Sequence, residues 1–116
     1  TPRQYSHYAE SLRLLKRFEE ARSLLRKTIP VARRVLRDND RLTLVMRMVY
    51  AAAIYCDASA TLDDLREAVT TLAETERTAR RVLGGAHPDT MGIEYDLRKA
   101  RAVRDARESG REVIFE

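Results

Sequence analysis

The sequence ARRVLRDNDRLTL at residues 32–44 returns as ARRVLGGAHPDTM at residues 79–91, without a gap and 47 residues later. Residues upstream align at the same spacing: Phe18, Glu20, Ala21 and Leu25 with Leu65, Glu67, Ala68 and Leu72. The pair Tyr8-Ala9 recurs as Tyr50-Ala51, 42 residues later, and the five-residue difference falls in the stretch 57–61. Self-similarity at a fixed period of this length is the signature of stacked repeats, each built from one helix pair.

Apolar residues recur every three or four positions in five segments, which predicts five helices. We expect them at about 4–15, 18–37, 42–56, 62–83 and 89–107. The segment 42–56 is apolar nearly all round, with Arg47 as its one charged residue, so it should lie in the middle of the domain. No segment alternates with a period of two, so we predict an all-helical fold.

Local signals indicate where these helices end. Pro30 removes a backbone donor, so the second helix either kinks there or ends and restarts; the continuous apolar stripe favours the kink. Thr61 followed by Asp64 predicts a capping box, and Gly84 predicts a left-handed helix end. We expect Asp89 or Thr90 to cap the fifth helix.

The composition suits a folded helical domain. The 116 residues are 34% charged and 44% hydrophobic, which predicts one domain at 1–110 with a tail at 111–116. No apolar run approaches the roughly 20 residues of a membrane span. The single cysteine, Cys56, excludes an intrachain disulfide and favours a reducing compartment, the cytoplasm, although a fragment or a processed organellar chain stays open because the sequence begins at Thr1.

Charge is distributed unevenly along the chain. Residues 1–47 hold 12 Lys and Arg against 5 Asp and Glu, a net of +7, whereas residues 48–116 hold 10 against 13, a net of −3. A basic half can attract phosphates, but acidic residues such as Glu10 and Glu19 interleave with the arginines. We therefore favour a salt-bridged helix surface over a nucleic-acid surface.

No set of residues supports catalysis, a metal site or a cofactor. The two histidines, His7 and His87, have no second ligand at metal-binding spacing, and His87 precedes Pro88 in a turn, which favours a structural role. Cys56 lies at the end of an apolar helix, so we expect a buried, inert thiol. Asp63 and Asp64 are explained by the helix start that they occupy. The sequence predicts a protein that is not an enzyme.

Several short motifs resemble the kinesin-light-chain class of tetratricopeptide repeats. The matching stretches are Tyr8-Ala9, Phe18-Glu19-Glu20-Ala21, Arg81-Val82-Leu83-Gly84 and His87-Pro88-Asp89-Thr90. The resemblance implies a right-handed α-solenoid of about two and a half helix pairs, with a first pair at 4–37, a second at 42–83 and a capping helix at 89–107. Counted from Thr90, the site of Ala51 holds Arg98, which suits a last helix with a wettable outer face. The residues expected to make that face wettable are Arg98, Lys99, Arg101, Arg104 and Arg107.

In such arrays the first helix of each pair lines a concave groove that holds a peptide or a partner helix. The resemblance assigns to that groove the following residues: Arg3, Ser6, His7, Glu10, Arg13, Val45, Met48, Val49, Ala52, Tyr55, Tyr95, Asp96 and Lys99. The family places paired asparagines where this chain has Ser6-His7 and Met48-Val49, which favours an apolar occupant over an extended peptide backbone. A partner helix, a second copy of the chain or the tail 113–115 would each fit, and Met48 and Val49 could equally be core.

We therefore expect a non-catalytic interaction or scaffolding module that binds a protein helix or peptide through its concave face. Two other functions stay open. One is a structural subunit, in a homo-oligomer or a larger assembly, because two and a half repeats are few for independent stability. The other, which the scarcity of aromatic residues beside the cations disfavours, is a weak nucleic-acid binder using the basic N-terminal half.

Overall fold

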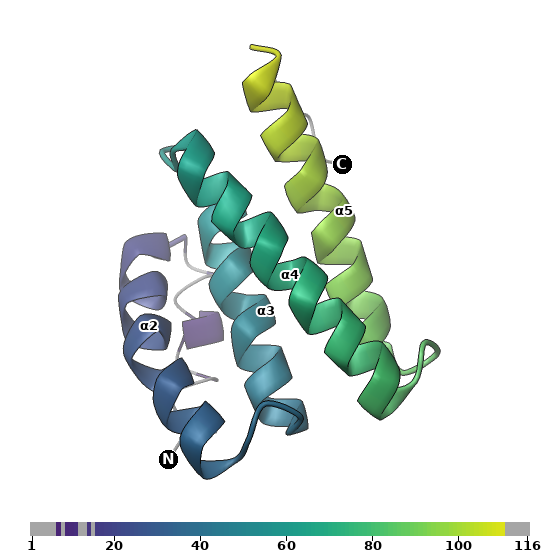
Figure 1. The fold of residues 1–116 in the computed structure, drawn as a ribbon. Helices are drawn as coiled ribbons and strands as arrows, with labels where there is room; N and C mark the ends of the chain where they lie inside the picture. Colours follow the sequence, from purple (N-terminus) through teal and green to yellow (C-terminus); the bar gives the residue numbers. More distant parts are fainter. Residues whose placement is uncertain (1–6, 8, 12–13, 15, 111–116) are drawn as a thin grey trace.

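The computed structural model describes residues 7, 9–11, 14 and 16–110, and the regular elements in that part of the chain are helices (Figure 1). Four are described in full: α2 (Phe18–Val35), α3 (Arg41–Tyr55), α4 (Leu62–Leu83) and α5 (Pro88–Glu108). Residues 7, 9–11 and 14 are helical as well, within the first predicted helix. The all-helical prediction is confirmed for these residues.

The four helices pack largely in chain order. The central helix α3 packs against α2, α4 and α5, and α4 packs against α5, whereas the backbones of α2 and α5 do not meet. Figure 1 shows α2 and α5 on opposite sides of the molecule. The described helices therefore do not form a bundle closed by contact between α2 and α5.

The central position of α3 follows from its composition. Ten of its 15 residues are buried, from Thr43 near its start to Tyr55 at its end. Since α3 has neighbours on several sides, an apolar residue is stabilised at nearly any position around the helix. The prediction that this segment lies in the middle of the domain is confirmed.

Burial repeats with the same 47-residue spacing as the sequence. The buried residues Ala21, Leu25, Thr28 and Ala32 of α2 correspond to Ala68, Leu72, Thr75 and Ala79 of α4. On α3 and α5 the corresponding buried residues are Thr43 and Thr90, Met46 and Ile93, Tyr50 and Leu97, and Ala53 and Ala100. The pairs α2–α3 and α4–α5 thus use equivalent positions for their cores.

Small residues allow the close approach of the helices. Ala21 of α2 and Ala53 of α3 are both fully buried and lie in one apolar cluster with Phe18 and Leu24. Ala9, in the helical segment before α2, is also fully buried and belongs to the main core. A larger side chain at such a site would force the helices apart.

The helix ends agree with the predictions in part. Thr61 Oγ1 accepts a hydrogen bond from the Asp64 N–H at 3.1 Å, and Asp64 Oδ2 accepts one from the Thr61 N–H at 3.0 Å, so the capping box is confirmed. The predicted cap of the last helix is wrong. Its N-cap is His87, whose Nδ1 accepts a hydrogen bond from the Asp89 N–H at 3.0 Å. Because Pro88 needs no partner for a backbone N–H, α5 begins at the proline and its cap lies one residue before it.

The sequence left open whether α2 is interrupted at Pro30, and it misplaced the end of α3. Helix α2 runs unbroken through Pro30, so the alternative in which the helix ends and restarts there is wrong. Helix α3 ends at Tyr55, and Cys56 is its exposed C-cap residue. The prediction of a buried Cys56 is wrong because the buried run of α3 ends one residue earlier.

Candidate functional site

The predicted groove residues fall into three groups by exposure. His7 and Tyr95 are exposed; Glu10, Val45, Met48, Asp96 and Lys99 are partly buried; and Val49, Ala52 and Tyr55 are buried. Arg3, Ser6 and Arg13 lie outside the described residues. The buried residues belong to the main apolar core, so they support the surface beside them.

The structure brings the predicted residues of α3 and α5 together. The sulfur of Met48 lies 3.8 Å from the place that a Cβ at Gly92 would occupy, so the two helices are close at this point. The hydroxyl of Tyr55 donates a hydrogen bond to Asp96 Oδ1 at 2.7 Å. Burial and the neighbouring Asp96 carboxylate raise the pKa of Tyr55 well above its ordinary value, so Tyr55 stays a neutral donor.

The exposed part of this surface combines apolar and cationic side chains. Met91 is 56% exposed and Tyr95 is 47% exposed, one turn apart on α5. The Lys99 ammonium lies 4.4 Å from the centre of the Tyr95 ring, within cation–π range. We define the α3–α5 face as Val45, Met48, Met91, Tyr95 and Lys99.

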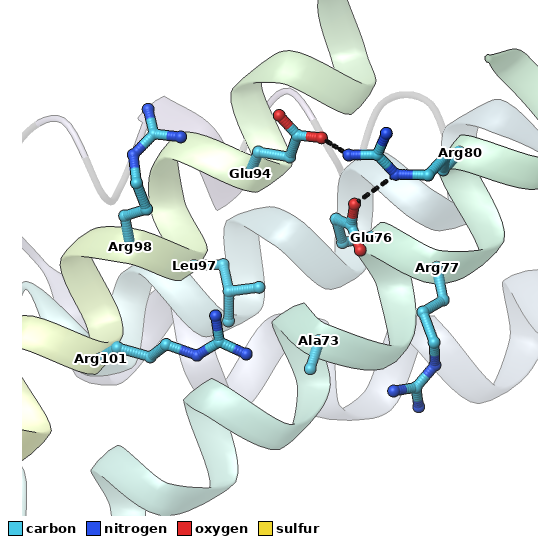
Figure 2. A pocket seen from close by; sticks show the side chains of 8 residues that line it. All are labelled: Ala73, Glu76, Arg77, Arg80, Glu94, Leu97, Arg98 and Arg101. Carbon is cyan, nitrogen blue, oxygen red and sulfur yellow. Dashed lines mark hydrogen bonds and ion pairs between the residues drawn. The ribbon is translucent and has the colours of Figure 1, made fainter. Parts of the chain in front are cut away.

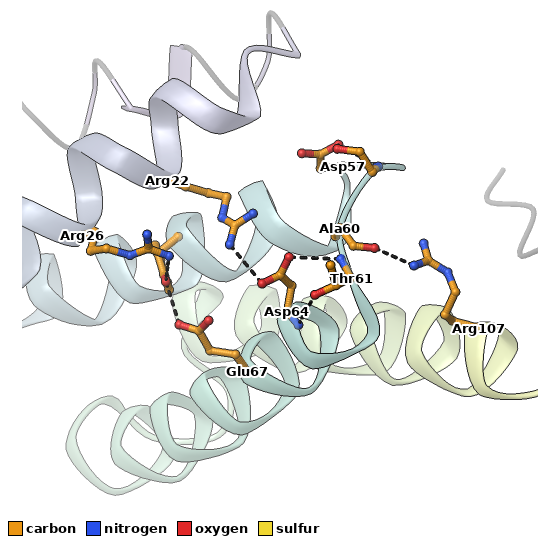
Figure 3. Close-up of polar contacts among 10 residues, drawn as sticks. Arg22, Arg26, Asp57, Ala60, Thr61, Asp64, Glu67 and Arg107 are labelled. Carbon is orange, nitrogen blue, oxygen red and sulfur yellow. Dashed lines mark hydrogen bonds and ion pairs between the residues drawn. The ribbon is translucent and has the colours of Figure 1, made fainter.

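Polar side chains join the helices on the other side of α3 (Figure 3). Arg26 donates a hydrogen bond to the Tyr50 hydroxyl at 3.2 Å, and that hydroxyl donates to Glu67 Oε2 at 2.6 Å, which connects α2, α3 and α4. Arg22 pairs with Asp64 at 3.3 Å. Burial is the main reason that the pKa of Tyr50 is raised.

The uneven charge along the sequence is explained in part by such contacts. Besides Arg22, Arg41 of α3 pairs with Asp89 of α5, and Arg47 pairs with Glu74 of α4 at 3.1 Å. In each pair an arginine from residues 1–47 meets a carboxylate from residues 48–116. These arginines of the basic half therefore stabilise the fold, and less of the positive charge is left for an external partner.

Sequence reasoning missed the role of Arg107. We expected it to keep the outer face of the last helix wettable, but it donates a hydrogen bond to the carbonyl oxygen of Ala60 at 2.5 Å (Figure 3). It donates a second one to the carbonyl oxygen of Ala58 at 3.4 Å. These bonds tie the end of α5 to the loop between α3 and α4. No local signal in the sequence could reveal a contact across 47 residues.

A second surface, which the sequence analysis did not predict, lies along the seam of α4 and α5 (Figure 2). It is a hollow of about 350 Å³, here named the α4–α5 groove, lined by Ala73, Glu76, Arg77, Arg80, Glu94, Leu97, Arg98 and Arg101. Arg80 donates to Glu76 Oε1 at 2.8 Å and also pairs with Glu94. The remaining arginines give the groove a positive character.

The described residues contain no group of three or more His, Cys, Asp and Glu side chains placed to hold a metal ion. His87 has the structural role that its turn predicted, as the cap of α5. His7 is exposed on the helical segment before α2, as expected for a surface residue. Within the described chain, none of the helices has the length and apolar character needed to cross a bilayer.

Comparisons with protein-family models, with curated proteins and with solved structures gave no match.

Proposed function

We propose that this chain is a non-catalytic protein-interaction module, built as a tetratricopeptide-like right-handed stack of helix pairs, that binds a partner helix or peptide through the α3–α5 face. The observation that carries the proposal is the pairing of α3 with α5. The 47-residue spacing makes α3 and α5 the equivalent helices of successive pairs, and the two helices lie side by side. Met91 and Tyr95 of α5 remain exposed to solvent.

The composition of the α3–α5 face favours an amphipathic partner. Met48 and Met91 have flexible, polarizable side chains that adapt to an apolar surface. Tyr95 combines a large apolar ring with a polar hydroxyl, and tyrosine is enriched at protein interfaces for that reason. Lys99 beside the ring adds a cation to the face.

The buried members of the predicted groove have a supporting role in this proposal. Tyr55 and its hydrogen bond to Asp96 hold α5 at a set distance from α3. Val49 and Ala52 fill the space beneath the face. A face that is rigid before binding loses less conformational entropy when the partner binds.

The proposal can be tested by selecting helical peptides that bind the intact chain from a displayed library, and then measuring their affinity for two variants. Tyr95→Ala removes a side chain from the α3–α5 face. Val82→Ala is a matched control, because Val82 is 41% exposed on α4 and lies outside the face.

We expect Tyr95→Ala to weaken peptide binding by about tenfold, which corresponds to ~1.4 kcal/mol. Val82→Ala should change the affinity less than about twofold, within the small effect usual for surface sites. Selected peptides whose affinity is unaffected by Tyr95→Ala, or equally reduced by both changes, would contradict the assignment of the face.

A further inference from the structure

The α4–α5 groove lies on a different side of α5 from the α3–α5 face. Gly92 and Asp96 of α5 contact α3. Arg101 is nine residues after Gly92, which at 100° per residue places it on the opposite side of the helix. The groove therefore lies mainly on the side of α5 that faces away from α3, and it meets the α3–α5 face where Arg98 lies 5.9 Å from the Tyr95 ring. An inference about the groove does not rest on the function proposed for the α3–α5 face.

The groove carries more positive charge than its own carboxylates neutralise. Four arginines line it, against two glutamates. Both glutamates pair with Arg80, and Figure 2 shows the two contacts as dashed lines from its guanidinium. Arg77 and Arg101 form no hydrogen bond or ion pair with any described residue, and Arg98 has only the Tyr95 ring nearby, at 5.9 Å. Three guanidinium groups of the α4–α5 groove are therefore available to bind a ligand.

The floor of the groove is apolar. Leu97 is 7% exposed, and it lies with Ala73 between the arginines in Figure 2. A guanidinium binds a carboxylate through two parallel N–H···O bonds, which gives strength and direction. The groove therefore matches a short peptide segment with an aliphatic side chain, which would contact the apolar floor, and with carboxylates around it, which would pair with the arginines.

We propose that the α4–α5 groove is a second docking site, which binds an acidic peptide segment of a partner protein through Arg77, Arg98 and Arg101. Nucleic acid fits the groove less well. None of the residues that line the groove is an aromatic side chain on which a base could stack.

The test uses the full 116-residue chain and a fluorescein-labelled decapeptide of alternating Glu and Ala, with the same peptide carrying Gln in place of Glu as the neutral comparison. Fluorescence anisotropy at about 150 mM salt measures the dissociation constants, since exposed charges are substantially screened at that ionic strength. The native chain should bind the acidic peptide at least about tenfold more tightly than the neutral one.

The variant Arg77→Gln/Arg101→Gln should weaken binding of the acidic peptide by about tenfold. Its matched control, Lys27→Gln/Arg34→Gln, removes the same charge from exposed sites on α2 and should leave the dissociation constant within about twofold. Arg98→Gln, a single change on the same rim, gives a second independent measurement and should weaken binding several-fold. All variants replace exposed side chains, and circular dichroism should show unchanged helix content.

Three results would overturn the proposal. The first is an equal loss of affinity in the two double variants, which would show attraction by net charge alone. The second is equal binding of the acidic and neutral peptides by the native chain. The third is displacement of the acidic peptide by a single-stranded oligothymidylate at a lower concentration than unlabelled acidic peptide requires, which would assign the groove to nucleic acid.

Discussion

Two threonines show at the scale of single residues how closely the helix pairs correspond. Thr43 and Thr90 are 47 residues apart, both at the third position of their helices, and both are fully buried. Among the residues that the structure describes, the hydroxyl of each has no hydrogen-bond partner. A buried hydroxyl without a partner is destabilising, so the shape of threonine, and not its polarity, suits these positions.

Replacing such a threonine with valine should therefore stabilise the protein. Thr43→Val keeps the shape and removes the unpaired hydroxyl, and we expect the free energy of unfolding to rise by about 1 kcal/mol. Thr75→Val is the control, because the Thr75 hydroxyl donates to the Thr71 carbonyl at 2.6 Å. It should lower the stability by about 0.5–1 kcal/mol. Urea denaturation measures both; a loss of stability in Thr43→Val would show that its hydroxyl has a partner.

At the scale of the elements, the ends of α2 and α4 differ in one informative way. Arg37, just past the end of α2, has φ of +78°, and Gly84, its equivalent 47 residues later, has φ of +93°. Glycine adopts positive φ without steric cost, whereas other residues are strained by roughly 1–2 kcal/mol. The ψ of Gly84 is 154°, so Gly84 has a positive φ but not the left-handed helical conformation that the sequence predicted. Gly84 therefore suits the backbone conformation at the end of α4 better than Arg37 suits that at the end of α2.

Because of this difference, we expect Arg37→Gly and Gly84→Ala to change the stability of the protein in opposite directions. Arg37→Gly should raise the free energy of unfolding by about 0.5–1 kcal/mol, because it relieves the strain at the end of α2. Gly84→Ala should lower it by about 1 kcal/mol, and by strain alone, since no described residue beyond the two chain neighbours of Gly84 has a heavy atom within 4 Å of the added Cβ. Thermal unfolding followed by circular dichroism measures both, and a destabilised Arg37→Gly would contradict the argument.

At the scale of the whole molecule, one long-range ion pair joins two helices whose backbones do not meet. Arg22 of α2 reaches Asp64 of α4, although these two helices have no close backbone contact. The pKa of Asp64 is held below its ordinary value, first by the hydrogen bond from the Thr61 backbone N–H and also by Arg22. Asp64 therefore stabilises both the start of α4 and the attachment of α2.

The pH dependence of stability follows from that lowered pKa. A carboxyl group that is more acidic in the folded state contributes stability above its unfolded pKa of about 3.9, and this contribution is lost as the pH falls through the lower folded pKa. We expect Asp64→Asn to lower the free energy of unfolding by about 1 kcal/mol at pH 7 and by less below about pH 3.

The control for this experiment is Asp63→Asn, because the Asp63 side chain is 93% exposed and its ion pair with Arg66 lies at the surface. It should change the stability by less than about 0.5 kcal/mol at any pH. Urea denaturation at a series of pH values gives the comparison. A difference between native protein and Asp64→Asn that does not shrink in acid would contradict the role of the ionised carboxylate.

Much of the secondary structure was determined by the sequence itself. The spacing of apolar residues predicted α2 to α5 within a few residues, and Thr61, Asp64 and Gly84 marked helix ends, because these signals act through hydrogen bonds and contacts within one or two helical turns. The 47-residue repeat likewise predicted which positions are equivalent in the core. For the helix that starts at Pro88, the sequence predicted Asp89 or Thr90 as the N-cap, but the N-cap is His87.

The tertiary structure alone decided which distant residues meet. It placed Val49, Ala52 and Tyr55 in the core, although they share a sequence pattern with the exposed members of the predicted groove. It paired Arg22 with Asp64 across 42 residues and Arg107 with Ala60 across 47, and it assembled the α4–α5 groove from two helices. Helical periodicity reports the direction of a side chain about its own axis, but its partners depend on the distance and angle between helices, which emerge only when the cores pack.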